Sequence, residues 1–196
     1  MGKIISGLLG LVMVVAVVSG TAYAVFSDQV QVSGVTLSTG NADLQIWDGD
    51  GWQESLSSAL FTGNTYPGWQ QGQYFALQNN SASNIGLDVT ARLTSAPSGN
   101  WGLLSPIVQV AVVQYDSQAA ALAAVAANNP GLGGVDASTG WQTLAAWNAS
   151  PIAISTNLLK GAQGDFVIWG KIPSDAGNSI ANQSLTTDWV LIGTQH

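Results

Sequence analysis

Residues 85–94 read IGLDVTARLT, and apolar and polar residues alternate along the whole stretch. In an extended chain, one face of this stretch would carry only apolar side chains, those of Ile85, Leu87, Val89, Ala91 and Leu93. The other face would carry Gly86, Asp88, Thr90, Arg92 and Thr94. A period of two with one apolar face is typical of an antiparallel strand that has its other face in water.

The same period recurs along most of the chain, between clusters of turn residues. Val30 and Val32 alternate with glutamines, and the apolar residues within 42–46 alternate with polar ones. Further strands are expected at residues 73–78, 107–114, 152–156, 165–172 and 189–192. So many short strands predict an all-β fold made of two sheets packed as a sandwich.

One segment breaks the pattern. Residues 117–127 are almost all alanine, with Leu122 and Val125 among them, and Asn128-Asn129-Pro130 follows. We expect one short helix here, with Asp116 as its N-cap. The Gly- and Ser-rich stretch 131–140 is expected to be a loop that leads back into the sheet.

The first 24 residues have the pattern of a secretion signal. Lys3 supplies a positive start, residues 4–18 are mostly apolar, and Ala22 and Ala24 fit a signal-peptidase site. The domains expected are therefore a signal peptide, 1–24, and a single mature domain, 25–196, in contact with the membrane only during export. An uncleaved anchor is the alternative, although Ser19-Gly20-Thr21 weakens a spanning helix.

Composition narrows the class of protein further. The chain has no cysteine, so an exported form has no disulfides, and its stability depends on packing or assembly. Removing Lys3 from the four basic side chains leaves Arg92, Lys160 and Lys171 against eleven acidic ones. Such a surface repels nucleic acid and anionic lipid, whereas its scarcity of charge permits close contact between copies.

Short blocks along the chain follow one another in an order that carries a resemblance. They are FSD at 26–28, VTLSTGNADL at 35–44, YPG at 66–68, LQNNS at 77–81 with the strand at 85–93, IPSDAGN at 172–178 and GTQ at 193–195. In this order they resemble the TasA/camelysin family of secreted biofilm fibre proteins, which are similar to the subunits of archaeal bundling pili. The Ala-rich helix and the stretch after it are not covered.

The resemblance implies a jelly-roll domain that forms extracellular biofilm fibres. In relatives that polymerise, the N-terminal strand of one subunit completes a sheet of the next. Residues 25–40 are then the candidate donor strand, and copies of the same chain are the expected partners. The expected polymerisation interface consists of Val25, Phe26, Val30, Val32, Val35 and Leu37.

The residues give this interpretation a physical basis. A strand freed by signal peptidase has no earlier element to pair with, and a sheet that lacks a strand exposes unpaired backbone groups. Insertion of the strand from another copy satisfies both, and contacts that do not close into a ring produce a filament. The alternative is that residues 25–40 fold back into their own sheet and leave a monomer.

An enzyme is not expected, and neither is a cofactor, a metal or a catalytic residue. A zinc protease needs two histidines on one helical turn with a glutamate between them, but this chain has one histidine, His196, and one glutamate, Glu54. A secreted metalloprotease is therefore the weaker alternative. A membrane-anchored or type IV-like pilin, which would keep its apolar N-terminal helix, is the other.

Two further patterns have simple structural explanations. Asp48-Gly49-Asp50-Gly51 resembles part of a calcium loop, but position twelve holds Ala59 or Ser57 in place of a bidentate glutamate, so a hairpin turn is expected. The eight tryptophans are scattered along the chain and are expected in the core or at subunit interfaces. Three sequons, which begin at Asn79, Asn148 and Asn182, are formal glycosylation acceptors.

Overall fold

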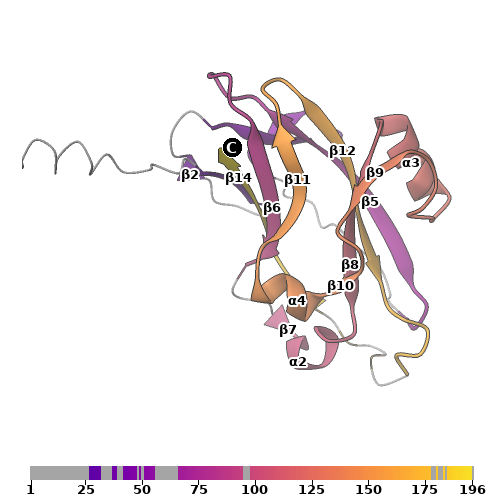
Figure 1. Cartoon of the computed structure of the whole chain (residues 1–196). Helices are drawn as coiled ribbons and strands as arrows, with labels where there is room; N and C mark the ends of the chain where they lie inside the picture. The colour runs from indigo at the N-terminus through magenta and orange to yellow at the C-terminus, as the bar shows by residue number, and fades with distance from the viewer. Residues whose placement is uncertain are drawn as a thin grey trace, which may run out of the picture.

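Two antiparallel sheets face each other and enclose the main core (Figure 1). The computed structural model describes residues 27–31, 37–38, 42–47, 49, 51–55, 66–94, 98–177, 180, 183 and 185–195. The expected signal peptide, 1–24, lies outside these residues. The two-sheet, all-β sandwich expected from the sequence is confirmed, whereas its jelly-roll winding stays a prediction.

The first sheet has five strands in the order β11-β6-β14-β1-β2. Their bounds are Ile152–Leu158, Leu87–Leu93, Trp189–Gln195, Ser27–Gln31 and Leu37–Ser38. Strand β6 is the centre of the alternating stretch, and its residues 87, 89, 91 and 93 are all buried while Arg92 is exposed. The period of two in the sequence therefore placed the correct face in the core.

The second sheet has the order β10-β8-β12-β5-β3-β4, and β9 also pairs with β8. The bounds, in that order, are Gln142–Thr143, Gln109–Tyr115, Gln163–Lys171, Gln70–Asn79, Leu44–Trp47 and Trp52–Gln53, with Val135–Ser138 for β9. A small ribbon of β7, Ser98–Gly99, and β13, Leu185–Thr186, lies apart.

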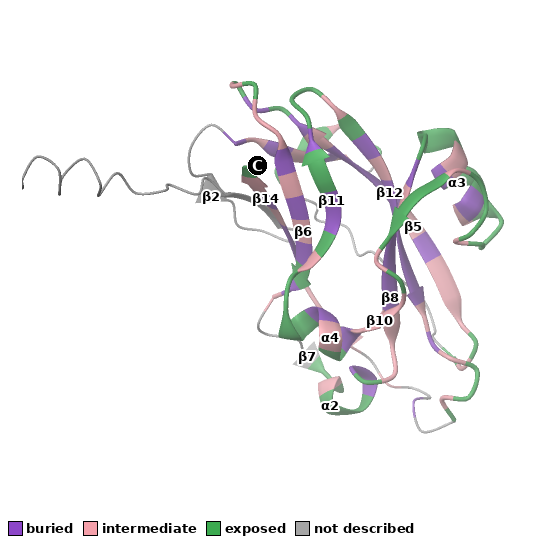
Figure 2. Ribbon diagram, in the orientation of Figure 1, coloured by how far each residue is buried: buried purple, intermediate pink, exposed green. Residues whose placement is uncertain are grey.

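The central strands of the second sheet are buried on both faces. On the inner face, Phe75 of β5 and Phe166 of β12 stack with their ring centroids 5.4 Å apart. On the outer face, helix α3, Gln118–Ala126, covers Trp169, which packs flat on Gly72 of the neighbouring strand. A Cβ at Gly72 would lie 2.8 Å from that ring, so the glycine makes room for the indole. Figure 2 shows buried β8 and β12 between the inner core and α3.

Two short helices close the lower end of the sandwich in Figure 1. They are α2, Trp101–Leu104, and α4, Leu144–Ala149. Helix α4 inserts Trp147, which is fully buried, donates its indole N–H to the Val110 carbonyl oxygen at 3.1 Å and meets Trp189 edge to face. The expectation that tryptophans pack in the core is confirmed for Trp147, Trp169 and Trp189.

Buried Asn79 ties the two sheets together at the opposite end. Its Nδ2 donates to the carbonyl oxygens of Ile85 at 2.9 Å and Leu158 at 2.8 Å, and its Oδ1 accepts from the backbone of Ser81. These bonds join the end of β5 to the entrance of β6 and the end of β11. Because Asn79 is fully buried and both amide hydrogens are used, the first of the three sequons is inaccessible in the fold.

The turns behave as the sequence predicted. Strands β3 and β4 are antiparallel and pair Trp47 with Trp52, in agreement with the expected hairpin, although Asp48 and Asp50 lie outside the described residues. In the Tyr66-Pro67-Gly68 turn, Trp69 donates its backbone N–H to the Tyr66 carbonyl oxygen, and Gly68 has φ +86°. A positive φ at the third position of a turn that has proline at the second is the reason for the glycine.

Three expectations about the Ala-rich region and the helices were wrong. The N-cap of α3 is Ser117, whose hydroxyl accepts from the backbone of Ala120, because the backbone N–H of Asp116 donates instead to the Gly134 carbonyl oxygen, just beyond the ends of β8 and β9. Part of the stretch 131–140 is a strand, β9, since it pairs with β8. The structure has two more helices, α2 and α4, besides the single one expected. Both are too short to have a detectable helical period in the sequence.

Candidate assembly edge

The candidate site is the side of the five-stranded sheet formed by β14, β1 and β2, which we call the β1 edge. Strand β14 lies between β6 and β1, and its residues Trp189 and Leu191 are part of the main core. Gly193 faces the core between the two sheets: a Cβ there would lie 3.3 Å from Leu87 of β6 and 3.4 Å from Leu44 of β3. Any larger side chain would crowd these two leucines, which explains an isolated glycine inside a strand.

Strand β1 pairs with β14 as a regular antiparallel ladder. Five consecutive pairs form without a shift of register: Ser27 with Thr194, Asp28 with Gly193, Gln29 with Ile192, Val30 with Leu191 and Gln31 with Val190. The ladder is made of backbone groups, which are the same in every copy of the chain. This single chain thus completes its own sheet, the fold-back arrangement that the sequence left open.

Beyond β1 the sheet ends in a very short strand. Strand β2 has two residues, and it pairs Ser38 with Asp28 and Leu37 with Gln29. Of the six residues expected at the polymerisation interface, Val30 is in β1 and Leu37 is in β2. Val25, Phe26, Val32 and Val35 lie outside the described residues, so the expected interface is only partly described.

The opposite edge of the same sheet is irregular. Strand β11 pairs with β6, but its register shifts twice, between Ala153 and Ser155 and between Ser155 and Leu158. Asn157 has φ +54°, and its backbone N–H donates to Asp88 Oδ1 at 2.8 Å. Strand β11 also lies against β8 and β9 of the other sheet. Bulges and cover of this kind prevent an edge from accepting another strand.

Strand β14 could be predicted from the sequence only as a strand at 189–192. Its pairing with β1 could not, and Leu191 and Gly193 had no predicted role, although GTQ was among the blocks that carried the resemblance. Gly193 was the available signal, because a glycine within a strand marks a close approach of another backbone or side chain.

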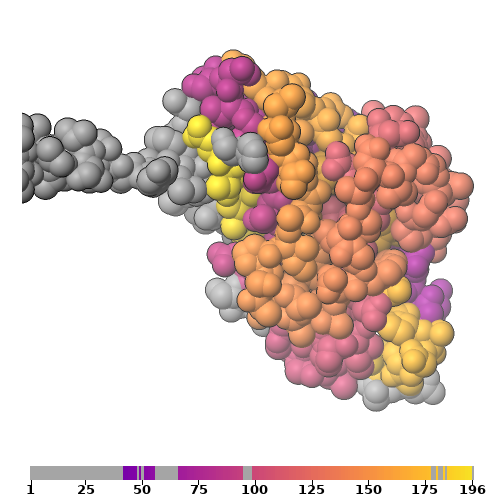
Figure 3. All heavy atoms as spheres, in the orientation of Figure 1, coloured from indigo at the N-terminus to yellow at the C-terminus, as the bar shows by residue number. Residues whose placement is uncertain are grey.

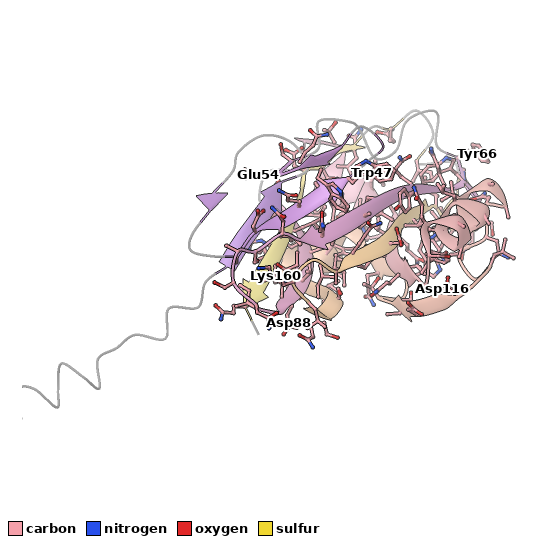
Figure 4. The ribbon with its side chains drawn as sticks, turned by 90° about the horizontal axis from the view of Figure 1, so that it is seen from above. Trp47, Glu54, Tyr66, Asp88, Asp116 and Lys160 are labelled. Carbon is pink, nitrogen blue, oxygen red and sulfur yellow. The ribbon has the colours of Figure 1, made fainter. Side chains whose placement is uncertain are left out.

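The acidic side chains that the structure describes outside this edge lie apart from one another. Among the described residues, no group of three His, Cys, Asp or Glu could hold a metal ion. Figure 4 shows Glu54, Asp88 and Asp116 on different sides of the molecule. Asp48, Asp50 and His196 lie outside the described residues, so the predictions about a calcium loop and about enzyme activity stay untested.

One titratable pair lies inside the second sheet. The Tyr74 hydroxyl donates to Asp165 Oδ1 at 2.6 Å, and burial, followed by this carboxylate, raises the pKa of Tyr74 well above its usual value. Burial also raises the pKa of Tyr115. Both phenols therefore stay neutral in the folded chain and serve as hydrogen-bond donors to the fold.

A hollow near the end of β6 is lined by Arg92, Leu93, Thr94 and Asn148. It has a single charged side chain, so these residues supply no acid and base pair. Within the part of the chain that the structure describes, no helix is long and apolar enough to cross a membrane.

Comparisons with known proteins leave the geometry as the main guide to function. No protein-family model matches this chain, and the search of curated proteins finds no match.

Proposed function

We propose that this protein is the structural subunit of an extracellular filament or biofilm matrix fibre, in which copies join by exchanging the strand within residues 25–40. The observation that carries the proposal is the regular β1–β14 ladder at the edge of the sheet. In the filament, β1 of one copy pairs with β14 of the next in the same register. The resemblance to the TasA/camelysin family supports the same function.

The exchange conserves nearly all the interactions of the edge. The five backbone pairs between β1 and β14 are identical whether the strand comes from the same chain or from a neighbour. Strand β3, which follows β1 and β2 in the chain, belongs to the other sheet, so an exchanged β1 would stay linked to its own sandwich through the segment between Gln31 and Leu44. An identical element exchanged between copies is a low-cost route to assembly.

The donor and the acceptor are different surfaces of one chain, and this difference favours a filament. Each copy gives one strand and receives one, so the contact is head to tail and continues from copy to copy when the rotation does not close. The irregular β11 edge limits pairing to one side of the sheet. A chain without cysteine gains stability from such pairing in place of disulfides.

Disulfide trapping between two differently substituted chains tests the exchange. Gln29 pairs with Ile192, and the natural chain has no cysteine, so the substitutions Gln29→Cys and Ile192→Cys place one thiol on each side of the ladder. We would make each substitution in a separate mature chain, mix the two chains during assembly and oxidise them. Strand exchange predicts covalent heterodimers on a non-reducing gel, which disappear on reduction.

In the control, the second cysteine is placed at Thr90 of β6 and Ile192 is kept. Thr90 pairs with Ile192 on the side of β14 away from β1. A thiol introduced by Thr90→Cys lies two strands from position 29, about 10 Å at ordinary strand spacing, too far for a disulfide. If filaments are seen by electron microscopy but no heterodimers form between the Gln29→Cys and Ile192→Cys chains, strand exchange is wrong. If the mature chains form no filaments, the filament function itself is wrong.

A further inference from the structure

Strands β3 and β4 present two tryptophans on the outer face of the second sheet. Leu44 and Ile46 of β3 are in the core, so Trp47, one residue further along the strand, points away from it. Trp52 is paired directly with Trp47 and lies on the same face. It is 37% exposed and Trp47 is half-buried, whereas the three tryptophans of the core are buried. Trp52 therefore adds little to the stability of the fold.

Four polar side chains lie on the same face, as the register of the sheet shows. Trp47 pairs with Ala76 and Ala76 pairs with Asp165, so only an alanine stands between the indole and the carboxylate. In the next row, two residues along each strand, three paired glutamines follow from β3, β5 and β12. All four polar side chains are exposed or half-buried. We call this surface the tryptophan face; it consists of Trp47, Trp52, Asp165, Gln45, Gln78 and Gln163.

Asp165 has one carboxylate oxygen left for a ligand. Its Oδ1 accepts from the Tyr74 hydroxyl at 2.6 Å and from Gln163 Nε2 at 3.1 Å, whereas no residue that the structure describes donates to Oδ2. Tyr74 is itself fixed, because its ring packs edge to face on Trp47 with the ring centroids 5.7 Å apart. The indole and the carboxylate are therefore held relative to each other before anything binds. Preorganisation of this kind lowers the entropy cost of binding.

The tryptophan face is an open strip with a wall on one side. Tyr115, which pairs with Asp165, is buried, and its hydroxyl donates to the Pro130 carbonyl oxygen at 2.8 Å in the turn after α3. Figure 3 shows α3 and this turn as a lobe that projects on the right of the molecule. From β4 to β12 the strip crosses three strand spacings, about 14 Å. An open strip suits an extended chain, since small molecules bind in concave pockets.

The chemistry of the face decides which kind of chain it fits. None of its six residues is basic, and the whole protein has a net charge of −7, so nucleic acid and acidic polysaccharides are repelled. An apolar protein segment would cover Asp165 and the glutamines and leave them without partners. An uncharged sugar ring avoids both costs. Its C–H groups rest on the negative face of an indole, and its hydroxyls donate to the carboxylate and exchange hydrogen bonds with the amides.

We propose that the tryptophan face binds a chain of an uncharged polysaccharide. Trp52, with Trp47 beside it, stacks on the sugar rings, while Asp165 and the glutamines bind their hydroxyl groups. This binding site goes beyond the filament proposed above and does not depend on it, because the face belongs to the other sheet and takes no part in the pairing of β1 with β14.

Calorimetric titration of the mature chain with hexasaccharides tests the proposal. The uncharged probes are cellohexaose, mannohexaose and laminarihexaose, and hexagalacturonate is the acidic one. At least one uncharged probe should bind, and the acidic one should not. Trp52→Ala should raise the dissociation constant about tenfold, and Asp165→Asn, which still accepts from Tyr74, should raise it severalfold.

The matched control is Tyr66→Ala. It removes a 61% exposed aromatic ring in the turn before β5, at the end of that strand opposite to the tryptophan face. The dissociation constant should stay within about twofold of the parent value. Urea unfolding of Trp52→Ala should also match the parent, which separates the loss of a ligand contact from a loss of stability.

Absence of binding by all three uncharged probes overturns the proposal, and so do tighter binding of hexagalacturonate and an unchanged dissociation constant in Trp52→Ala. If Trp52→Ala loses filaments but keeps sugar binding, the face is a contact between copies and the proposal is wrong. Filaments can form normally in each of the first three cases, so failure here is distinct from failure of strand exchange.

Discussion

The β1 edge of the five-stranded sheet is a straight ladder of five pairs, whereas the β11 edge is bulged twice and strained at Asn157. The two strands also differ in how they are fixed. The end of β11 is held by the buried amide of Asn79, while β1 has the two-residue β2 outside it. Both strands also lie against the other sheet, β11 against β8 and β9 and β1 against β3.

This difference between the β1 and β11 edges indicates where the fold can exchange a strand. Backbone pairing in a regular ladder can be given up and remade with another copy at nearly constant energy, because the partner groups are identical. A bulged strand fixed by side chains loses specific contacts when it leaves. We therefore expect changes at the β1 edge to act on assembly and changes at the β11 edge to act on the stability of a single chain.

The largest effect is expected from deletion of residues 25–40. The deletion exposes the unpaired backbone of β14 beside buried Leu191, so filaments should be absent and the chain should be monomeric or aggregated. Electron microscopy and light scattering measure both outcomes. A synthetic peptide of residues 25–40 should bind the deleted chain and keep it soluble. Normal filaments from the deleted chain would show that the β1 edge is not needed for assembly.

The second largest effect is expected when the same charge is introduced at each of the two edges and polymer yield is compared. Val30→Asp puts a carboxylate opposite the core residue Leu191, and a charge in apolar surroundings costs at least about 2 kcal/mol. Polymer yield, measured by pelleting, should fall to background. Thr156→Asp adds the same charge at an exposed site on β11 and should leave the yield unchanged. An equal loss of polymer in both variants would show that the added net charge, and not its place at the β1 edge, prevents assembly.

The third prediction concerns the fixing of β11. Asn79→Ala leaves the carbonyl oxygens of Ile85 and Leu158 without their buried donor, so the free energy of unfolding should fall by about 3 kcal/mol. Urea unfolding measures this, and hydrogen exchange should show the loss of protection concentrated in β11. Asn80→Ala is the control, because Asn80 is exposed and its amide contacts Asp43. A similar loss in both variants would contradict the assignment.

The smallest effect is expected at the bulge itself. Asn157→Ala places a residue with an ordinary side chain at φ +54° and should cost about 1 kcal/mol, while Asn157→Gly should be close to neutral. Thermal unfolding of the two variants provides the measurement. Filament yield should be the same in both, since the β11 edge takes no part in the exchange. A change of yield in Asn157→Ala would show that the two edges are coupled.

Much of the fold could be predicted because the pattern is local. The expected strands at 73–78, 85–93, 152–156 and 165–172 all overlap observed strands, and α3 covers the Ala-rich segment. What could not be predicted depends on distant partners. Strand β9 has four exposed residues and no buried face, so only its pairing with β8 makes it a strand. Asp116 fails as the cap because its backbone N–H donates to the Gly134 carbonyl oxygen just beyond the ends of β8 and β9.

The sequence by itself determined the alternating faces, the turns at glycine and proline and the absence of disulfides, because each follows from a residue and its near neighbours in the chain. Only the tertiary structure decided that β1 lies beside β14, that Asn79 joins the two sheets and that α3 points its leucine outward. Each of these depends on which backbone and side chains come together across long separations, as between Val30 and Leu191, and no local pattern encodes that choice.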